Sequence, residues 1–245
     1  MRAGLGIDKM NLTHRVRLLT IDLDDTLWPC FPTIHRAEDA LYAWIAERAP
    51  GLARAHDQQS LRRHRKGVAE KVPEIAHDLT ALRHASLSAL LRDFGYDTEL
   101  AEEAMSVFLR HRNQVKPYAD VVPALHELKR HYRLVSVTNG NAAIARTPLR
   151  GLFDLSLTAA DVGAQKPDPA LFRGALKWAG VAPAQALHVG DHPLLDVEAA
   201  RGFGMAAVWV NRDGQTWPQP LAPPALEVAD LRQLGKWLEQ TRREA

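Results

Sequence analysis

Residues 16–26 read Val-Arg-Leu-Leu-Thr-Ile-Asp-Leu-Asp-Asp-Thr, an apolar run that ends in a group of carboxylates. The apolar part, residues 16–21, has the length and the composition of a buried strand. Because side chains two apart in a strand point to the same side, Asp22 and Asp24 are expected to lie together beyond its carboxyl end. Two such carboxylates can divide the work of catalysis, one as nucleophile or metal ligand and the other as acid and base.

Apolar runs of the same kind recur in the second half of the chain. They are residues 132–138, 155–158, 186–190 and 206–210, followed by a short candidate edge strand at 227–229. Segments with helical periodicity alternate with them, at residues 121–129, 170–179, 195–202 and 231–242. Near-continuous apolar strands that alternate with helices predict a parallel α/β sheet of Rossmann-like type, covered on both faces.

A long helical insertion separates the first two strands. Residues 34–112 carry helical periodicity, and no convincing strand interrupts it. A parallel crossover needs only about a dozen residues, so an insertion of this length is expected to form its own all-helical subdomain. We therefore expect a core of residues 1–27 and 116–245 and a helical cap of residues 28–115. A cap inserted at the carboxyl end of a parallel strand is expected to lie over the ligand site.

Polar side chains also follow the other strands. Thr138 and Asn139 follow the second strand, and Asp191 follows the strand at 186–190, with Asp196 five residues later. Lys166 precedes a Pro-Asp-Pro helix start. Each piece alone is typical of a turn or a helix start. Taken in order at the ends of parallel strands, they are expected to meet in one crevice.

This arrangement resembles the haloacid dehalogenase superfamily of phosphohydrolases over nearly the whole chain, from about residue 16 to residue 238. The segment Asp22–Thr26 corresponds to the first motif of that superfamily, Thr138 to the second and Lys166 to the third. Gly190-Asp191 with Asp196 corresponds to the fourth. The helical insertion resembles the C1-type cap of the same superfamily. The resemblance implies a phosphoric monoester hydrolase.

The residue types also fit this chemistry on electrostatic grounds. A phosphomonoester is a dianion, so an attacking carboxylate meets a repulsion of about 4 kcal/mol per charge pair at about 4 Å and an effective dielectric constant of about 20. A cation must offset it, and because every available ligand is an oxygen, Mg²⁺ is the expected cofactor. We expect Asp22, Asp24 and Asp191 to hold the ion, with Asp196 supporting them.

The expected reaction has two steps. Asp22 attacks phosphorus and forms an aspartyl-phosphate, while Asp24 protonates the leaving alcohol and later deprotonates the hydrolytic water. Thr138, Asn139 and Lys166 are expected to bind the phosphoryl oxygens as charge redistributes. A dehalogenase is disfavoured, because expulsion of a halide needs no general acid, and the dehalogenases that resemble this chain lack an acid at the place of Asp24.

The substrate is suggested by a narrower resemblance. Residues 72–83 and 137–142 resemble bacterial flavin mononucleotide phosphatases and the enzymes that dephosphorylate 5-amino-6-(5-phospho-D-ribitylamino)uracil in riboflavin biosynthesis. This resemblance implies one of those two substrates, with nucleoside monophosphates and sugar phosphates as alternatives. His77, Asp78 or Arg83 either points into the crevice or belongs to a solvated helix start.

Two further features allow two interpretations each. The basic run Arg62–Lys66 either attracts an anionic substrate or forms a solvated helix face. Trp28 either contacts a flat ring of the substrate or packs in the core.

Two other functions also remain open: a phosphosugar mutase of the same superfamily, and a phospho-receiver switch, which would keep its aspartyl-phosphate for longer.

Composition excludes several other classes. The formal net charge is +2, which gives no reason to expect nucleic acid or a membrane as partner. Cys30 is the only cysteine, so no intrachain disulfide can form and a reducing cytoplasm is expected. Residues 1–15 lack the apolar core of a secretory signal. The expected partner is a small phosphate ester, and the sequence indicates no oligomeric state.

Overall fold

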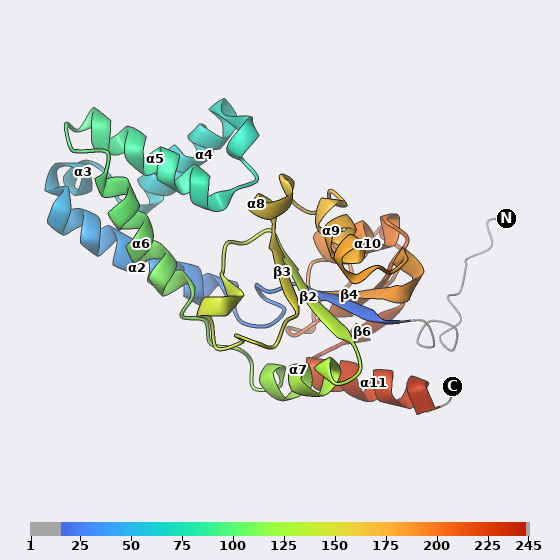
Figure 1. Ribbon diagram of the computed structural model, residues 1–245. Helices are drawn as coiled ribbons and strands as arrows, with labels where there is room; N and C mark the ends of the chain where they lie inside the picture. Colours follow the sequence, from blue (N-terminus) through green and yellow to red (C-terminus); the bar gives the residue numbers. More distant parts are fainter. Residues whose placement is uncertain (1–15, 244–245) are drawn as a thin grey trace. The chain divides into compact units, whose positions relative to one another are not determined.

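β1 (Leu18–Ile21) lies near the centre of a parallel sheet. The computed structural model describes residues 16–243, and within them the sheet has the strand order β3-β2-β1-β4-β5-β6 (Figure 1). The other strands are β2 (Arg133–Thr138), β3 (Leu155–Thr158), β4 (Ala186–Gly190), β5 (Ala206–Val210) and β6 (Leu226–Val228). Every neighbouring pair is parallel. The predicted α/β fold is confirmed.

The order of the strands reverses between β1 and β4. The chain builds β2 and β3 on one side of β1, and β4, β5 and β6 on the other. Such a reversal separates the loops at the carboxyl ends of the two central strands and opens a crevice there. Asp22 directly follows β1, and Asp191 directly follows β4. The two carboxylates therefore leave the sheet on either side of the switch point.

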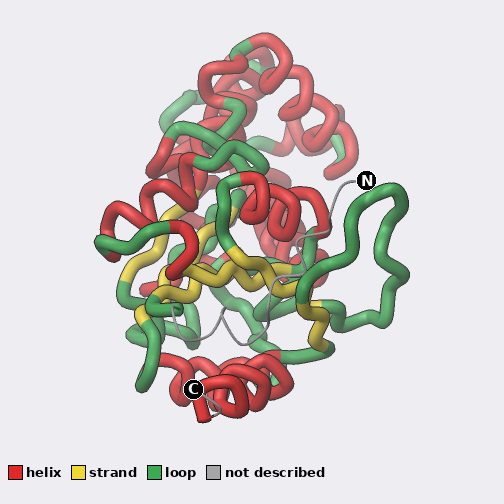
Figure 2. The backbone as a smooth tube through the Cα atoms, turned by 90° about the vertical axis from the view of Figure 1, so that its right-hand side faces the viewer, coloured by secondary structure: helices red, strands yellow, loops and turns green. Residues whose placement is uncertain are grey.

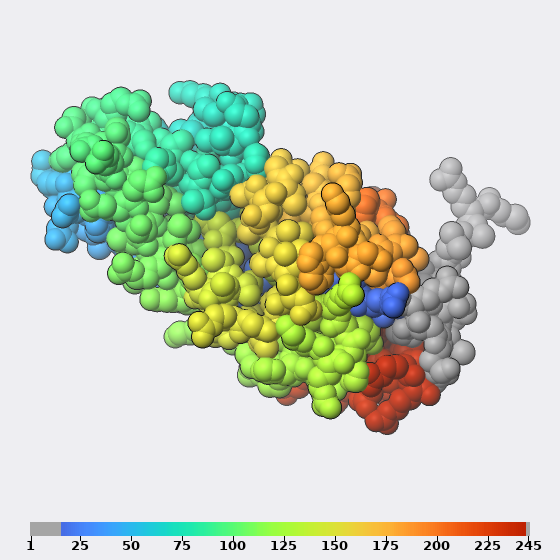
Figure 3. Space-filling view, in the orientation of Figure 1, coloured from blue at the N-terminus to red at the C-terminus, as the bar shows by residue number. Residues whose placement is uncertain are grey.

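Helices cover both faces of this sheet (Figure 2). On one face lie α9 (Ala170–Ala179), η4 (Pro193–Glu198) and α10 (Ala199–Gly202), packed on side chains such as Val135 and Ala207. On the other face lie α7 (Val121–Lys129) and α11 (Leu231–Arg243). Short turns α8 (Ala159–Val162) and η3 (Pro183–Gln185) complete this unit. β1 is wholly buried. The small dark blue patch at the surface in Figure 3 marks the start of the described chain.

A second compact unit is helical. It contains α2 (Cys30–Arg48), α3 (Pro50–Ala55), α4 (Gln58–Lys71), η1 (Pro73–Ile75), α5 (Leu79–Asp93), α6 (Leu100–Arg112) and η2 (Ile144–Arg146). It comprises residues 29–116 together with 139–148, and the remaining chain forms the sheet-containing unit. The predicted boundaries place residues 139–148 with the sheet, whereas in the structure these residues pack with the helices.

The helical unit forms because its helices carry apolar stripes and capped ends. Ala37, Leu41 and Ile45 repeat every four residues along α2 and are buried against α6, in one apolar cluster with leucines of α5. Asp78 accepts hydrogen bonds from Thr80 N at 2.9 Å and Ala81 N at 3.0 Å, which caps α5. The interpretation of Asp78 as part of a helix start is confirmed.

One predicted helix differs in form. The segment expected as a helix over 195–202 begins at Pro193 and runs as the π-helical turn η4 before continuing as α10. His192 Nδ1 accepts from Leu194 N and Leu195 N, both at 3.2 Å, and this side-chain cap starts the turn. The prediction about a secretory signal concerns residues outside the described part. None of the helices within residues 16–243 has the length and apolar character needed to cross a bilayer.

Candidate active site

Lys166 lies buried between two carboxylates at the carboxyl end of the sheet. Its Nζ donates to Asp22 Oδ1 and to Asp196 Oδ1, each at 2.5 Å, and to the carbonyl of Val137 at 3.2 Å. The lysine side chain is 2% exposed, so this charge is held almost out of water. The end of β1, the end of β2 and η4 are thus joined by one ammonium group. Asp22, Lys166 and Asp196, all predicted site residues, are brought together.

Asp196 accepts hydrogen bonds at both of its carboxylate oxygens. Its Oδ1 also accepts from His188 Nε2 at 3.1 Å, and its Oδ2 accepts from His192 N at 2.9 Å. Gly190 permits this approach, because a Cβ added there would lie 2.3 Å from Asp196 Cγ. Both carboxylate oxygens therefore already have protein donors.

His188 is the residue of this cluster that sequence reasoning missed. It lies on β4 with no solvent exposure, and its Nδ1 is 2.9 Å from Thr20 Oγ1 and 3.1 Å from the carbonyl of Thr20. Burial lowers the pKa of the imidazole, so the neutral ring donates through Nε2 to Asp196. In the sequence, a lone histidine in an apolar strand looks like any core residue.

Asp191 is fixed by the turn that follows β1. Thr26 Oγ1 donates to Asp191 Oδ1 at 2.7 Å, and Trp209 Nε1 donates to the carbonyl of Asp191 at 2.7 Å. The turn itself requires Asp25 in the left-handed region, with φ of 59°. Arg212 Nε donates to the carbonyl of Thr26 at 2.9 Å, which anchors the turn from β5.

Arg212 is in turn held by a buried acid. Its Nη1 and Nη2 donate to the two carboxylate oxygens of Asp120, each at 3.0 Å, and its guanidinium lies 4.0 Å from the ring centroid of Tyr118. A bidentate pair of this kind fixes both direction and distance. Sequence reasoning gave no signal for Arg212, because Asp120 lies 92 positions away.

Asp24 takes a different environment from the other predicted acids. Its Oδ1 accepts from Trp28 Nε1 at 2.8 Å, and its carboxylate is not part of the group formed by Asp22, Asp191 and Asp196. Trp28 is fully buried, which agrees with packing and not with contact to a substrate ring. Thr138 ends β2 and is 2% exposed, and Asn139 begins the segment that packs with the helical unit.

The donor set fits a hard divalent cation. Oxygens of Asp22, Asp191 and Asp196 lie within 4.8 Å of one another. Burial, and then the charge of Asp196, raises the pKa of Asp191 to about 7, and burial raises the pKa of Asp22 despite the nearby ammonium. Lys166 and His188 outweigh the effect of burial at Asp196 and hold the pKa of that carboxyl well below its usual range. A cation bound between Asp22 and Asp191 would stabilise the charged form of both carboxylates, which burial disfavours.

We expect a His188→Phe substitution to lower the free energy of unfolding by about 1–3 kcal/mol, because it removes one donor to the buried carboxylate of Asp196 and the ring partner of the buried Thr20 hydroxyl. Urea denaturation monitored by circular dichroism measures the change. His188→Gln keeps an N–H donor and should lose less, and His126→Gln, on the exposed side of α7, serves as the control. Equal stability of the Phe and Gln variants would contradict a structural role for the hydrogen bond to Asp196.

The α/β sheet gathers a lysine and three carboxylates at its switch point, which is where open parallel sheets bind ligands. The family model described as haloacid dehalogenase-like hydrolase matches residues 16–204. The chain belongs to this family of hydrolases. The predicted family resemblance and the prediction of an enzyme are confirmed.

Two proteins similar to this chain are named as phosphatases. The chain is 33% identical over 228 residues to the 5-amino-6-(5-phospho-D-ribitylamino)uracil phosphatase YigB of Escherichia coli K12, covering 90% of this chain and 95% of that protein. It is 41% identical over 150 residues to a phosphoserine phosphatase of Thermus thermophilus, covering 59% of this chain and 60% of the relative.

A solved structure described as a 2-haloacid dehalogenase, from Pseudomonas syringae pv. tomato DC3000, is 40% identical with a TM-score of 0.86. The match covers 92% of this chain and 99% of that one. A haloacid dehalogenase-type phosphatase from Thermococcus onnurineus is 26% identical with a TM-score of 0.65, covering 91% and 98% of the two chains. Relatives with phosphatase names and relatives with dehalogenase names thus share this fold.

Proposed function

We propose that this hydrolase cleaves phosphate monoesters through an aspartyl-phosphate intermediate on Asp22, with Mg²⁺ as cofactor. The observation that carries the proposal is the buried contact of Lys166 Nζ with Asp22 Oδ1 at 2.5 Å, with Asp191 in the same carboxylate group. A buried ammonium beside a carboxylate at the end of a parallel strand can balance the charge of an incoming phosphoryl group.

In the first step, an oxygen of Asp22 forms a bond to phosphorus as the bond from phosphorus to the ester oxygen breaks. Asp24 gives its proton to the departing alcohol oxygen. The hydrogen bond from Trp28 Nε1 to Asp24 Oδ1 holds this carboxyl in position. Lys166 and Thr138 are proposed to bind the phosphoryl oxygens, and Asn139 to assist them.

In the second step, Asp24 takes a proton from water, whose oxygen attacks phosphorus. The bond from phosphorus to Asp22 breaks, which frees phosphate, restores the carboxylate of Asp22 and leaves Asp24 protonated, as it was before the first step. A mutase would return the phosphoryl group to a sugar instead, and a phospho-receiver would retain it, so the lifetime of the aspartyl-phosphate in water separates these alternatives.

Asp22 and Asp191 are the proposed carboxylate ligands of the cation. Asp24 is the proposed third ligand through its backbone carbonyl, because its carboxylate lies outside the group that Asp22 and Asp191 form. Asp196 is the proposed supporting residue, because Lys166, His188 and His192 N already occupy both of its oxygens. When bound, the ion supplies positive charge that offsets the repulsion between Asp22 and the dianionic substrate.

The proposed substrate is flavin mononucleotide or another riboflavin-pathway phosphate. The relative that matches 90% of the chain is named for 5-amino-6-(5-phospho-D-ribitylamino)uracil, which supports this choice. Relatives named for phosphoserine, phosphoglycolate and pyrimidine nucleotides keep nucleoside monophosphates and sugar phosphates as alternatives. A cytoplasmic location is also proposed, because a chain with a single cysteine cannot form an intrachain disulfide.

A dehalogenase is the second candidate, because the structural neighbour with a TM-score of 0.86 is described as a 2-haloacid dehalogenase. Halide is a good leaving group that needs no proton. Asp24 has a use in the hydrolysis of an ester and none in that reaction, and its presence favours phosphoryl transfer.

A panel assay tests the proposal. Phosphate release is measured from flavin mononucleotide, the ribitylaminouracil phosphate, nucleoside monophosphates and sugar phosphates, and chloride release from 2-chloropropionate. We expect phosphate release in Mg²⁺ that falls to background in EDTA and returns when Mg²⁺ is restored. The two flavin-pathway compounds should be the fastest substrates.

Other outcomes are equally informative. Faster release from another phosphate ester would keep the reaction and overturn the proposed substrate. Phosphate release that persists unchanged in EDTA would contradict the metal requirement. Chloride release without phosphate release would establish the dehalogenase instead.

A further inference from the structure

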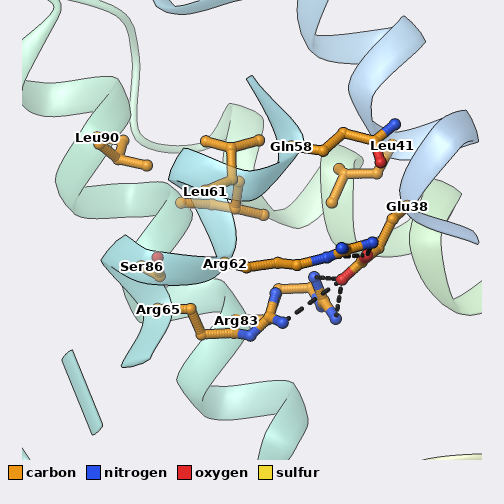
Figure 4. A pocket seen from close by; sticks show the side chains of 10 residues that line it. Glu38, Leu41, Gln58, Leu61, Arg62, Arg65, Arg83, Ser86 and Leu90 are labelled. Carbon is orange, nitrogen blue, oxygen red and sulfur yellow. Dashed lines mark hydrogen bonds and ion pairs between the residues drawn. The ribbon is translucent and has the colours of Figure 1, made fainter. Parts of the chain in front are cut away.

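Three arginines surround one buried carboxylate in the helical unit (Figure 4). Glu38 comes from α2, Arg62 and Arg65 from α4, and Arg83 from α5, and all four line the same pocket. Leucine side chains form the rest of its wall, among them Leu61 and Leu90. The basic run Arg62–Lys66 was expected either to attract substrate or to form a solvated helix face. In the structure two of its arginines, Arg62 and Arg65, line this pocket instead.

The positive charge in this cluster exceeds the negative charge. Glu38 accepts from Arg62 Nε at 2.6 Å, but its contacts with Arg65 and with Arg83 are longer, at 3.4 Å. Bonds of that length are weak. The neighbouring acid, Asp39, has a half-exposed side chain and accepts hydrogen bonds from Gln58 at the pocket rim and from His35. Three guanidinium groups therefore share one buried carboxylate and one half-exposed carboxylate.

Arg83 is the arginine of this cluster with a buried N–H group that lacks an acceptor among the described residues. It is 9% exposed, its guanidinium lies 3.8 Å from the ring centroid of Phe108, and its Nε donates to no acceptor within residues 16–243. Burial, followed by repulsion from Arg65, lowers the pKa of Arg83 to about 9. A buried charged donor without an acceptor is unfavourable, and an anion would satisfy both the charge and the N–H group.

The size of the pocket limits the ligand. Its cavity is about 20 Å³, which is enough for one particle of the size of water. This space is too small to enclose a phosphate ester, a nucleotide or a flavin. We propose that this pocket is a binding site for a small monovalent anion of the size of chloride, held by Arg83 Nε and the guanidinium groups of Arg62 and Arg65.

The bound anion would link three helices through one point. Arg62 and Arg65 belong to α4, Arg83 to α5, and Glu38, already bonded to them, to α2. An anion that binds the folded unit and not the unfolded chain stabilises it in proportion to the logarithm of its concentration. The site is thus a structural ligand site of the helical unit, separate from the carboxylates and lysine of the sheet.

The test compares chloride with gluconate, an anion too large for the cavity, at equal ionic strength. Thermal unfolding of the full-length protein is followed by circular dichroism as sodium gluconate is replaced by sodium chloride. We expect the melting temperature to rise with the logarithm of the chloride concentration, by roughly 3 °C at ten times the dissociation constant. Broadening of the chloride-35 NMR line, reversed by excess bromide, provides a second readout of binding.

Two variants define the site. Arg83→Lys keeps the charge but removes Nε, so we expect about a tenfold weaker chloride response. Glu38→Gln removes the competing carboxylate, so this variant should be less stable in gluconate yet gain more from chloride than the native chain. Arg92→Lys, at an exposed position of α5, is the matched control and should respond like the native protein.

Identical melting curves of the native protein in chloride and gluconate would overturn the proposal, and so would a full chloride response in Arg83→Lys. If Arg83→Lys fails to fold, the Glu38→Gln comparison still decides the question. Neither failure touches the phosphatase proposal, which depends on Asp22 and Lys166.

Discussion

Replacing Asp22 with Asn is expected to reduce turnover of the preferred phosphate ester by a factor on the order of 10⁴ or more. The amide has nearly the same shape as the carboxylate but cannot form the aspartyl-phosphate. It also withdraws one of the two carboxylates that hold Lys166 Nζ. Steady-state phosphate release in saturating Mg²⁺ measures the loss, and acid-quenched protein should contain no acid-stable, hydroxylamine-sensitive phosphate.

A matched control separates the nucleophile from general effects of charge. Asp93→Asn removes a carboxylate from an exposed position at the end of α5 and should retain native turnover. Far-ultraviolet circular dichroism should be the same for both variants and the native chain. Turnover of Asp22→Asn within tenfold of the native rate would contradict the proposed mechanism, because a group other than Asp22 would then have to attack phosphorus.

Replacing Lys166 with Met is expected to affect both turnover and stability. The ammonium lies 2.5 Å from Asp22 Oδ1 and from Asp196 Oδ1, so its removal leaves two buried carboxylates without their shared partner. Breaking a buried ion pair on one side costs about 3–5 kcal/mol. Turnover should fall below detection as well, because the phosphoryl oxygens lose a fixed positive charge.

The pH dependence of this loss has a definite sign. In the native chain, the depressed pKa of Asp196 gives stability above the unfolded-state pKa that is lost as pH falls through the folded-state value. Without the ammonium, the pKa of Asp196 should rise, so protonation at low pH relieves the variant. The gap in unfolding free energy between native and Lys166→Met should therefore narrow from pH 7 toward pH 4 in urea denaturation with EDTA.

Lys177→Met, at an exposed position of α9, is the control for loss of a lysine and should match the native chain at each pH. A gap for Lys166→Met that stays constant, or widens as the pH falls, would show that the lysine does not compensate these carboxylates.

The sheet was predictable because its information is local. The central strands are short, mainly apolar runs, and each is bounded by a turn or a helix start, as at Leu18–Ile21 and Ala186–Gly190. The candidate site was predictable for a related reason. Asp22, Asp191 and Thr138 directly follow or end their strands, and parallel strands present their carboxyl ends at one edge.

The supporting contacts were not predictable, because they join distant residues of ordinary type. His188 is one buried histidine in an apolar strand, and its bond to Asp196 depends on the turn of η4. Arg212 reaches Thr26 across 186 positions. The role of Arg83 follows from Glu38, which lies 45 positions earlier and carries no motif. Pairing of this kind is set by packing, and a single sequence does not display it.

The helical unit is assembled from two separate stretches of chain. Residues 139–148 join it through a bond from Ala143 N to Asn113 Oδ1 at 2.7 Å, and Asn141 bonds to Arg112 and Thr80, each at 3.2 Å. A chimaera that imports a foreign residue 29–116 block alone would leave these partners mismatched. Grafting one specificity onto another catalytic body of this family therefore means transplanting both stretches together, and recombination that respects only the longer one should yield poorly folded hybrids.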